Sequence, residues 1–581
     1  MSQAQKAKMK KIAMHGRITE EINSLHHASC SYNTQYYFRL ILFLIHNSAY
    51  IYILRALFQI TIHFCIFAKS ILPKMLNIIH HKVFDRFLSK SYENASAKRK
   101  IRARSNSYND ENIPHQRHTK KDEAHVLFAG ANNQDIVYNW SGINVIAHKT
   151  QLIIPNTIEQ ISQLARDTRS KISVMGTGLS YEQIMSIHLK DPQALLICMQ
   201  HFNGLIEMRE ESAVFGAATP INDIIKVLGE HDRMMPCSPG VIGIQTIAGS
   251  IATGTHGQGL YQSSYADIVQ SLTVVLPNGD IVKIDGSHKD FPLEAFITSI
   301  GMLGIVVNIE IAHVPRKVFS CRKMTVDIDE FLSNYQQWNE ENEYVKVWWF
   351  PKTDLCHVWL VDEADPSQTQ DFLCISRSSP IESKSENKSM NVTVRRYIDK
   401  MSHDTKSSST SSQPQFETLK RFASVKDLVG YSEQILCKGI PVPQINCEIA
   451  VPFSRARDAT LALRKWCDEN EDRLHYPFIY RTTGQSRAWL NPAFSGPVCY
   501  IGFLIYIASD GTTRADGMHS MLEIQKILAN HKGLPHWGKH FVPSVYNFRR
   551  DIPMYNQFKQ LRTRVDPKKK MMSKFLQDIF D

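Results

Sequence analysis

The stretch SVMGTGLSYE, residues 173–182, sets two glycines directly behind a short apolar run, as at the end of a buried strand. Gly176 and Gly178 tolerate positive φ, and a loop without Cβ atoms lets its backbone N–H groups face an anion. A second stretch, AGSIATGTHGQG at residues 248–259, repeats this composition and adds hydroxyl donors. One GxG turn alone is most often only a tight turn, but two loops of the same chemistry favour a site for an extended dinucleotide.

The composition is that of a globular protein with more than one domain. The 581 residues are 43% hydrophobic and 21% charged, and the formal net charge is +11. Residues 1–121 carry 20 Lys or Arg against 6 Asp or Glu, whereas the remainder carries 47 against 50. The positive charge therefore belongs to an N-terminal extension, and the rest of the chain does not read as a nucleic-acid binder. The 11 cysteines include no CxxC pair, so we expect neither a metal site nor a disulfide framework.

The extension, residues 1–125, contains an apolar segment at 38–73 and ends in a polar linker. Arg55 divides the segment into apolar stretches of 15 and 13 residues. Each is shorter than the roughly 20 residues that span a bilayer core, where a central charge costs about 3 kcal/mol. One tilted span, a re-entrant pair and a helix in the membrane interface all remain open, as does an amphipathic helix packed on the protein. We expect a membrane-associated helical extension, and with it a membrane-associated protein.

From residue 137 onward, short β-rich runs alternate with helical patterns, which predicts small α+β subdomains. The segment after Thr157 has apolar residues at helical spacing, and Thr157 with Gln160 predicts a capping box. The pair Asn278-Gly279 between two β-rich runs predicts a hairpin. A glycine-punctuated turn and a buried strand follow at residues 299–315.

At this point the chain resembles the vanillyl-alcohol-oxidase-type flavoproteins, and among them the aldonolactone oxidases and dehydrogenases of ascorbate-type biosynthesis. The resemblance rests on blocks in the family's order: NWSG, GTGLS, QTIAGSIATGTHGQG, SIGMLGIV, VWWFPKTD, PHWGKHF and LRTRVDPKKKMMSKFL. It implies an α+β protein with a PCMH-type FAD-binding domain of two subdomains at residues 137–315. An α+β substrate domain that caps the flavin would follow at residues 316–581.

The resemblance also implies which residues hold FAD. They lie in the two glycine loops and in the later turn: Gly176, Thr177, Gly178, Leu179, Ser180, Thr246, Gly249, Ser250, Thr253, Gly254, Thr255, His256, Gly257, Gly304 and Ile305. In many relatives a histidine bonded to the flavin stands where this chain has Leu179. Because leucine offers no nucleophile, FAD is expected to be held without a covalent bond.

In the substrate half, the resemblance assigns three catalytic residues. Lys539 would place positive charge at the flavin N1–C2=O edge, His536 would orient the ring or the substrate hydroxyl, and Arg481 would stabilise developing negative charge. The family's glutamate two residues before this arginine is replaced here by Ile479. Glu448, in a separate strand-like stretch, is interpreted as structural, with compensation for that loss as the alternative.

The implied reaction is hydride transfer from C2 of an aldono-1,4-lactone to flavin N5. Oxygen or an electron carrier such as cytochrome c would reoxidise the flavin, in the endoplasmic reticulum or in mitochondria. Because of Ile479, two alternatives stay open: a different polyol or sugar acid as substrate, or a membrane-tethered FAD-binding protein without lactone activity. The Ser- and Lys-rich insertion at residues 363–425 is predicted to be a solvated loop.

Overall fold

The computed structural model describes residues 126–127, 135–240, 242–262, 264–375, 422–437, 444–470, 476–507, 512–513 and 515–581. The apolar segment at 38–73 and most of the insertion at 363–425 lie outside these residues. Within the described part of the chain, no helix is both long and apolar enough to cross a bilayer. The predicted membrane-associated extension is therefore still a prediction.

A small parallel sheet in the FAD-binding half carries the first glycine loop. In it β6 (Leu195–Cys198) pairs with both β4 (Leu152–Ile153) and β5 (Ile172–Met175). An antiparallel pair, β2 (Ile136–Tyr138) and β3 (Val145–His148), precedes it. The apolar run that was predicted to be a buried strand is β5, and it ends where Gly176 begins the loop.

Helix α4 (Ile158–Asp167) connects β4 to β5. Its N-cap is Thr157, as predicted, because the Thr157 hydroxyl accepts the Gln160 N–H at 3.2 Å. The Gln160 side chain, however, accepts the N–H of Asn156 at 2.7 Å instead of that of Thr157. The predicted helix start is thus confirmed. The predicted capping box is incomplete, because the Gln160 side chain accepts the N–H one residue before the N-cap instead of that of the N-cap.

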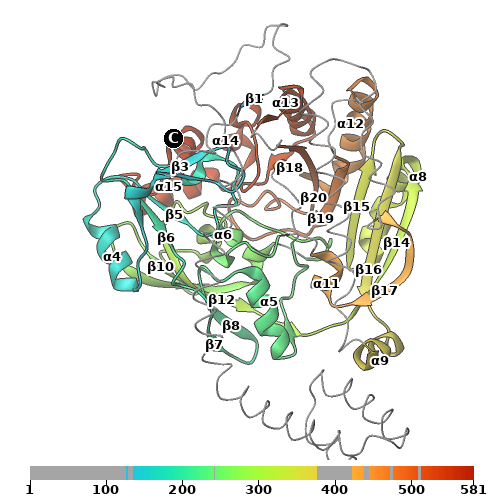
Figure 1. The fold of residues 1–581 in the computed structure, drawn as a ribbon, viewed down its shortest axis with the longest axis horizontal. Coiled ribbons are helices and arrows are strands. Elements are labelled where there is room, and N and C mark those ends of the chain that lie inside the picture. The colour runs from blue at the N-terminus through green and yellow to red at the C-terminus, as the bar shows by residue number, and fades with distance from the viewer. Residues whose placement is uncertain are drawn as a thin grey trace, which may run out of the picture. The chain divides into compact units, whose positions relative to one another are not determined.

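A five-stranded antiparallel sheet forms the second part of the FAD-binding half (Figure 1). Its order is β11 (Ile281–Asp285), β10 (Val269–Val275), β12 (Ile305–Ala312), β8 (Ser212–Gly216) and β7 (Leu205–Met208). The predicted hairpin joins β10 to β11, with Gly279 at φ +91°. Apolar faces of α5 (Ile221–Glu230) and α6 (Ile247–Ala252) share one core with this sheet. The two-residue strand β9 (Arg233–Met234) lies between α5 and α6 along the chain, and helix α7 (Leu293–Phe296) lies between β11 and β12. The two-residue strand β13 (Val314–Pro315) follows β12 and pairs with β9.

The substrate half is built on an eight-stranded antiparallel sheet (Figure 1). Its order is β17 (Val425–Gly430), β14 (Phe319–Asp327), β16 (Leu355–Glu363), β15 (Tyr344–Phe350), β19 (Phe478–Thr483), β20 (Val498–Tyr506), β18 (Gln444–Pro452) and β22 (Leu534–Pro535). Three helices pack on this sheet: α8 (Ile328–Glu341), α12 (Ala456–Asn470) and α13 (Ala515–Asn530). The mixture of helices and mainly antiparallel sheets agrees with the predicted α+β class.

The two faces of the eight-stranded sheet carry different kinds of side chain. In β19, Tyr480 points to the helix-covered face, where its ring lies 5.2 Å from that of Phe331 in α8. Successive side chains of a strand point to opposite faces, so Ile479 and Arg481 point the other way. The sheet alternation therefore separates a packed apolar face from a face that carries charge.

One prediction about the insertion is wrong at its start. Residues expected to be a solvated loop form helix α9 (Pro366–Ile375). Phe372 on this helix is buried against Val318 and Ala364, which gives the helix an apolar contact that the Ser- and Lys-rich composition of the insertion conceals. The short helix α11 (Ser432–Leu436) follows β17 at the far end of the insertion.

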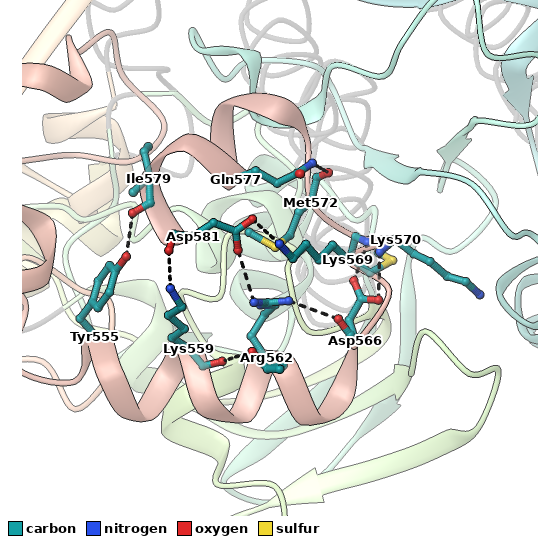
Figure 2. Close-up of polar contacts among 12 residues, drawn as sticks. Tyr555, Lys559, Arg562, Asp566, Lys569, Lys570, Met572, Gln577, Ile579 and Asp581 are labelled. Atoms are coloured by element: carbon teal, nitrogen blue, oxygen red, sulfur yellow. Dashed lines mark hydrogen bonds and ion pairs between the residues drawn. The ribbon is translucent and has the colours of Figure 1, made fainter.

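The C-terminal helices α14 (Phe548–Asp551), α15 (Tyr555–Val565) and α16 (Lys574–Phe580) lead the chain back to the FAD-binding half. Between α15 and α16, the Lys570 ammonium donates to the carbonyls of Ala165 at 2.5 Å and Pro277 at 2.9 Å. The Lys570 carbonyl accepts the N–H of Ile172, the first residue of β5. Figure 2 shows the polar contacts that hold this segment, among them Asp581 beside Lys569. Residues at the end of the predicted substrate domain thus stabilise the strand that carries the first glycine loop.

Candidate active site

The first glycine loop presents its backbone to a ligand. The N–H groups of residues 176–180 donate no hydrogen bond to any residue that the structure describes. Gly178 has φ +68°, and Trp140 N–H binds its carbonyl at 2.9 Å, so the turn is held from the carbonyl side. Five consecutive unbound donors are what a loop that holds phosphate oxygens provides.

The second loop lies directly against the first. A Cβ atom on Gly176 would lie 2.3 Å from the Thr246 hydroxyl, so only glycine allows this approach. Thr246 is the N-cap of α6 and accepts the Gly249 N–H. The N–H groups of Ile247 and Ala248 bind carbonyls of the protein itself. The donors of this helix start are therefore largely used within the protein.

A third segment, PHWGKHF, joins the two loops. The Gly538 carbonyl accepts the Tyr181 N–H at 3.2 Å, directly after the first loop. A Cβ atom on Gly538 would lie 3.2 Å from the Thr253 hydroxyl, directly after α6. The fold thus brings the predicted catalytic segment around Lys539 against both predicted cofactor loops.

Beside these loops lies a buried cluster of charge. Arg481 donates from Nη2 to Glu448 Oε1, and the two side chains are 9% and 2% exposed. His256 Nε2 lies 3.7 Å from the same carboxylate oxygen. The His256 ring stacks on Tyr500, with ring centroids 3.5 Å apart, and lies 5.5 Å from the ring of His536.

Sheet register explains why Glu448 faces Arg481. Glu448 in β18 is paired with Gly502 in β20, and Gly502 is paired on its other side with Ile479 in β19. Directly paired residues point to the same face, so Glu448 and Ile479 flank a position that has no side chain. Glu448 is therefore part of the charged cluster, which favours compensation for the missing family glutamate over a merely structural role.

Burial and charge set the protonation of the cluster. Burial acts to raise the pKa of the Glu448 carboxyl, but the charge of Arg481, with His256 and Lys539, holds it well below its usual range. Burial lowers the pKa of both imidazoles, and Arg481 lowers that of His256 further. Burial also lowers the pKa of Lys539, against the opposing effect of Glu448. Near neutral pH we infer an ionised carboxylate between neutral imidazoles.

Several buried polar atoms of this region have no hydrogen-bond partner among the described residues. They are Ser250 Oγ, His256 Nε2, Glu448 Oε2 and Arg481 Nε. A buried polar atom without a partner costs about 1–3 kcal/mol, and native proteins contain few of them. Together with the unbound N–H groups of the first loop, these atoms fit a polar organic ligand of considerable length.

A metal ion fits the cluster less well. Ligand atoms of His256, Glu448 and His536 lie within 4.8 Å of one another. However, Nδ1 of His536 accepts the Gly538 N–H at 3.0 Å, so the neutral ring carries its proton on Nε2 and offers that atom as a donor. Arg481 already binds the carboxylate, and its charge opposes that of a cation.

Comparison with protein families agrees with this geometry. Residues 150–285 match the FAD binding domain family, and residues 309–579 match the D-arabinono-1,4-lactone oxidase family. Together, in this order along the chain, the two matches support an FAD-linked aldonolactone oxidase. Its cofactor is FAD, and its enzymatic class is that of FAD-dependent oxidoreductases that act on CH–OH groups.

The individual proteins that this chain resembles are distant in sequence. An L-gulonolactone oxidase of Scyliorhinus torazame is 22% identical over 438 residues, which are 73% of this chain and 94% of the relative. A D-arabinono-1,4-lactone oxidase of Kluyveromyces lactis is 25% identical over 264 residues, 44% of this chain and 48% of the relative. A cholesterol oxidase structure from Brevibacterium sterolicum has a TM-score of 0.59 at 14% identity and covers 80% of this chain and 99% of its own. That likeness shows the PCMH-type fold.

Two residues predicted to hold FAD have a packing explanation within this family fold. A Cβ atom on Gly304 would lie 2.7 Å from the Val275 carbonyl, so glycine is required where β12 meets β10. Ile305 is 1% exposed and pairs with Val275. Both belong to the sheet core, and their assignment to the cofactor stays a prediction.

Some residues of the site are not marked by any local sequence pattern. Tyr500 and Gly502 lie in β20, whose residues are all buried and whose pattern is simply apolar. His540 and Glu182 form a pair across 358 residues, with Nδ1 of His540 2.7 Å from Oε1 of Glu182. Only strand register and loop packing reveal these neighbours.

Proposed function

We propose that this protein oxidises a sugar-derived aldono-1,4-lactone at C2. The observation that carries the proposal is the buried Glu448–Arg481 pair with His256, placed beside the two loops of an FAD-binding domain. FAD, when bound, supplies the two-electron chemistry by accepting a hydride from the carbon that bears the reacting hydroxyl. Residues 176–180 and Ser250 would hold the cofactor through their unbound donors.

The histidine of the second loop is suited to remove the proton of the reacting hydroxyl. Nδ1 of His256 lies 2.9 Å from the Gly257 carbonyl, so this nitrogen carries the ring proton and Nε2 keeps its lone pair. Nε2 is buried and has no hydrogen-bond partner among the described residues. The Glu448 carboxylate, 3.7 Å from the same Nε2, would stabilise the imidazolium that forms through its negative charge.

Two cations would stabilise negative charge. In the described part of the chain, Nε of Arg481 has no hydrogen-bond partner, so Arg481 can bind a lactone oxygen while its bond to Glu448 keeps it fixed. Lys539 is held by a loop that contacts both cofactor loops. Preorganised donors of this kind are worth about 3–4 kcal/mol where charge develops in a transition state.

A second candidate keeps the flavin chemistry but changes the substrate. Ile479 belongs to the edge of an apolar cluster with Trp348 and Phe422, so one side of Gly502 offers no carboxylate. A polyol or sugar acid with fewer hydroxyls on that side would fit against this apolar cluster. A membrane-tethered flavoprotein without lactone turnover is the third possibility, but the intact cluster around Glu448 favours an active enzyme.

Location and electron acceptor are part of the same proposal. The apolar segment at 38–73 and the basic residues around it support attachment to a membrane, of the endoplasmic reticulum or of mitochondria. Oxygen or a carrier such as cytochrome c would take the electrons. Leu179 in the first loop supports FAD held without a covalent bond.

The direct test is an anaerobic screen of the purified holoprotein against aldonolactones and alditols. We expect at least one aldono-1,4-lactone to bleach the flavin absorbance. Bleaching by alditols alone would favour the second candidate. A wild-type protein that none of them bleaches, but that becomes active in Ile479→Glu, would show that lactone turnover has been lost.

A further inference from the structure

Lys539 lies in a segment that has little regular structure to hold it. Residues 536–541 follow the two-residue strand β22 and precede the turn at residues 543–545. Within the segment, the Lys539 N–H binds the His536 carbonyl at 3.0 Å, which fixes the turn but not its direction. Because the expected task of Lys539 depends on the position of its ammonium group, something outside the segment must orient it.

Both neighbours of Lys539 are tied to consecutive residues of another segment. On one side, Gly538 accepts the Tyr181 N–H. On the other side, His540 contacts Glu182 through Nδ1 and Oε1 at 2.7 Å. Tyr181 and Glu182 directly follow the first glycine loop, so the lysine is bracketed by the loop that presents free backbone donors.

The side-chain contact is the more specific of the two ties. The side chains of His540 and Glu182 are only 13% and 12% exposed, so their contact is shielded from water and from salt. The His540 N–H also binds the Asn446 carbonyl at 2.8 Å, in the strand that carries Glu448. Residue 540 thus connects the first loop, the lysine and the charged cluster.

The Tyr181 ring completes the bracket. The Lys539 ammonium lies 6.0 Å from the centroid of this ring, at the limit of a cation–π contact. A shift of the 536–541 segment relative to residues 181–182 would therefore change the distance of the Lys539 ammonium from both the ring and the first loop.

We propose that Glu182 and His540 form a positioning pair that sets the Lys539 ammonium relative to the cofactor held by the first loop. The inference rests on the proposed flavin chemistry of Lys539 and adds to it the residues that aim the lysine. Positive charge near the flavin stabilises its reduced, negatively charged form, so the pair controls the reduction equilibrium through Lys539.

The test compares two-electron reduction potentials of the bound FAD, measured in holoprotein by equilibration with a redox dye, which needs no substrate. Glu182→Ala and His540→Ala are each expected to lower the equilibrium constant for reduction about tenfold. This corresponds to a potential lower by about 30 mV for a two-electron couple. The double variant is expected to fall no further than either single variant, because both remove one contact.

Three further variants make the result specific. His540→Asn, which keeps an N–H donor near the place of Nδ1, is expected to stay within twofold of the wild type. Lys539→Met gives the full effect of losing the ammonium. Glu523→Ala removes a His–Glu pair within helix α13, in which His519 Nε2 lies 2.8 Å from Glu523 Oε1, and should leave the potential unchanged.

The outcomes separate the two proposals. A potential that moves in Lys539→Met but not in Glu182→Ala or His540→Ala would overturn the positioning pair alone. A potential that stays constant even in Lys539→Met would remove the lysine from the flavin chemistry, and the pair with it. If one of the alanine variants does not fold, the contrast between His540→Asn and the other alanine variant decides.

Discussion

Two arginines of the substrate half bind carboxylates in opposite surroundings. Arg464 in α12 reaches Asp354 at 2.7 Å and Asp329 at 3.1 Å, with side chains that are 29% to 78% exposed. Arg481 in β19 binds Glu448, and both side chains are nearly inaccessible. The exposed arginine has carboxylate partners for both of its terminal nitrogens, whereas Nε of Arg481 and Oε2 of Glu448 have none among the described residues.

The difference in burial and in polar atoms without partners indicates which of the two ion pairs has a role beyond stability. A surface ion pair contributes about 0–1 kcal/mol and needs no function to explain it. A buried pair is costly to desolvate and often contributes nothing net to stability, so its retention with unused polar atoms points to a ligand. We therefore propose that the buried pair, and not the pair of Arg464, contacts the substrate.

The largest expected effect is on stability when the buried pair is broken. Arg481→Met leaves the Glu448 carboxylate buried without its main partner, which should lower the free energy of unfolding by about 3–5 kcal/mol. Arg464→Met is the matched control and should cost about 1 kcal/mol or less. Urea unfolding of both variants measures the contrast, and equal losses would abolish the distinction between the two pairs.

The next effect is on the rate of flavin reduction. Removing the charge of Lys539 takes away a preorganised cation worth roughly 3 kcal/mol, so Lys539→Met should slow anaerobic bleaching by an active lactone about 100-fold. FAD should remain bound, because residues 176–180 hold it. Stopped-flow absorbance gives the rate, and an unchanged rate would exclude Lys539 from the reaction.

Removal of FAD should lower the free energy of unfolding of the protein. It should not require the cleavage of a covalent bond between protein and flavin. Because Leu179 has no nucleophilic atom, acid precipitation should release all FAD into the supernatant. In a separate measurement, free FAD added to the apoprotein at 100 times its dissociation constant should raise the free energy of unfolding by about 2.7 kcal/mol. Flavin that stays in the washed pellet would show a covalent link that the sequence does not predict.

The smallest effects are shifts of the pH profile. Because burial and Arg481 lower the pKa of His256, the base stays neutral and active to a lower pH than an ordinary histidine. On the alkaline side, the lowered pKa of Lys539 means that its charge is lost earlier than for an ordinary lysine. On the acid side, we expect the bleaching rate to fall only at a pH below the usual pKa range of histidine. On the alkaline side, we expect it to fall at a pH below the usual pKa range of lysine. An acid limb at the ordinary histidine pKa would contradict the role of His256.

The same cluster links pH to stability. The pKa of Glu448 is lower in the folded chain than in the unfolded chain, so its pairing stabilises the fold above the ordinary glutamate range. This contribution is lost as the pH falls through the lowered value. Arg481→Met should remove that acid dependence, which urea unfolding at a series of pH values would detect.

Local features of the fold were predictable because they depend on neighbouring residues. The apolar run before Gly176, the Asn278-Gly279 hairpin and the cap at Thr157 all follow from sequence spacing, and the structure confirms each of them. The family resemblance added the FAD cofactor, which the match of residues 150–285 to the FAD binding domain family bears out, whereas the predicted bounds of that domain, 137–315, stay a prediction.

What the sequence could not predict depends on register between distant strands. Glu448 and Arg481 are 33 residues apart, and they meet only because β18 and β19 both pair with β20. Helix α9 was missed because Phe372 packs on Val318 and Ala364, residues outside the helix, and the polar composition of the insertion conceals this burial. In both instances the deciding interaction is tertiary, and no local pattern encodes it.

The central claim is that the Glu448 cluster performs lactone oxidation. Glu448→Gln keeps the shape of the side chain but removes the charge that orients His256 and Arg481. Holoproteins of the wild type and of this variant should be mixed anaerobically with the best lactone of the screen while flavin absorbance is followed. We predict rapid bleaching of the wild type and a rate at least about 100-fold lower in the variant with FAD still bound. Equal bleaching rates in the two proteins would contradict the account.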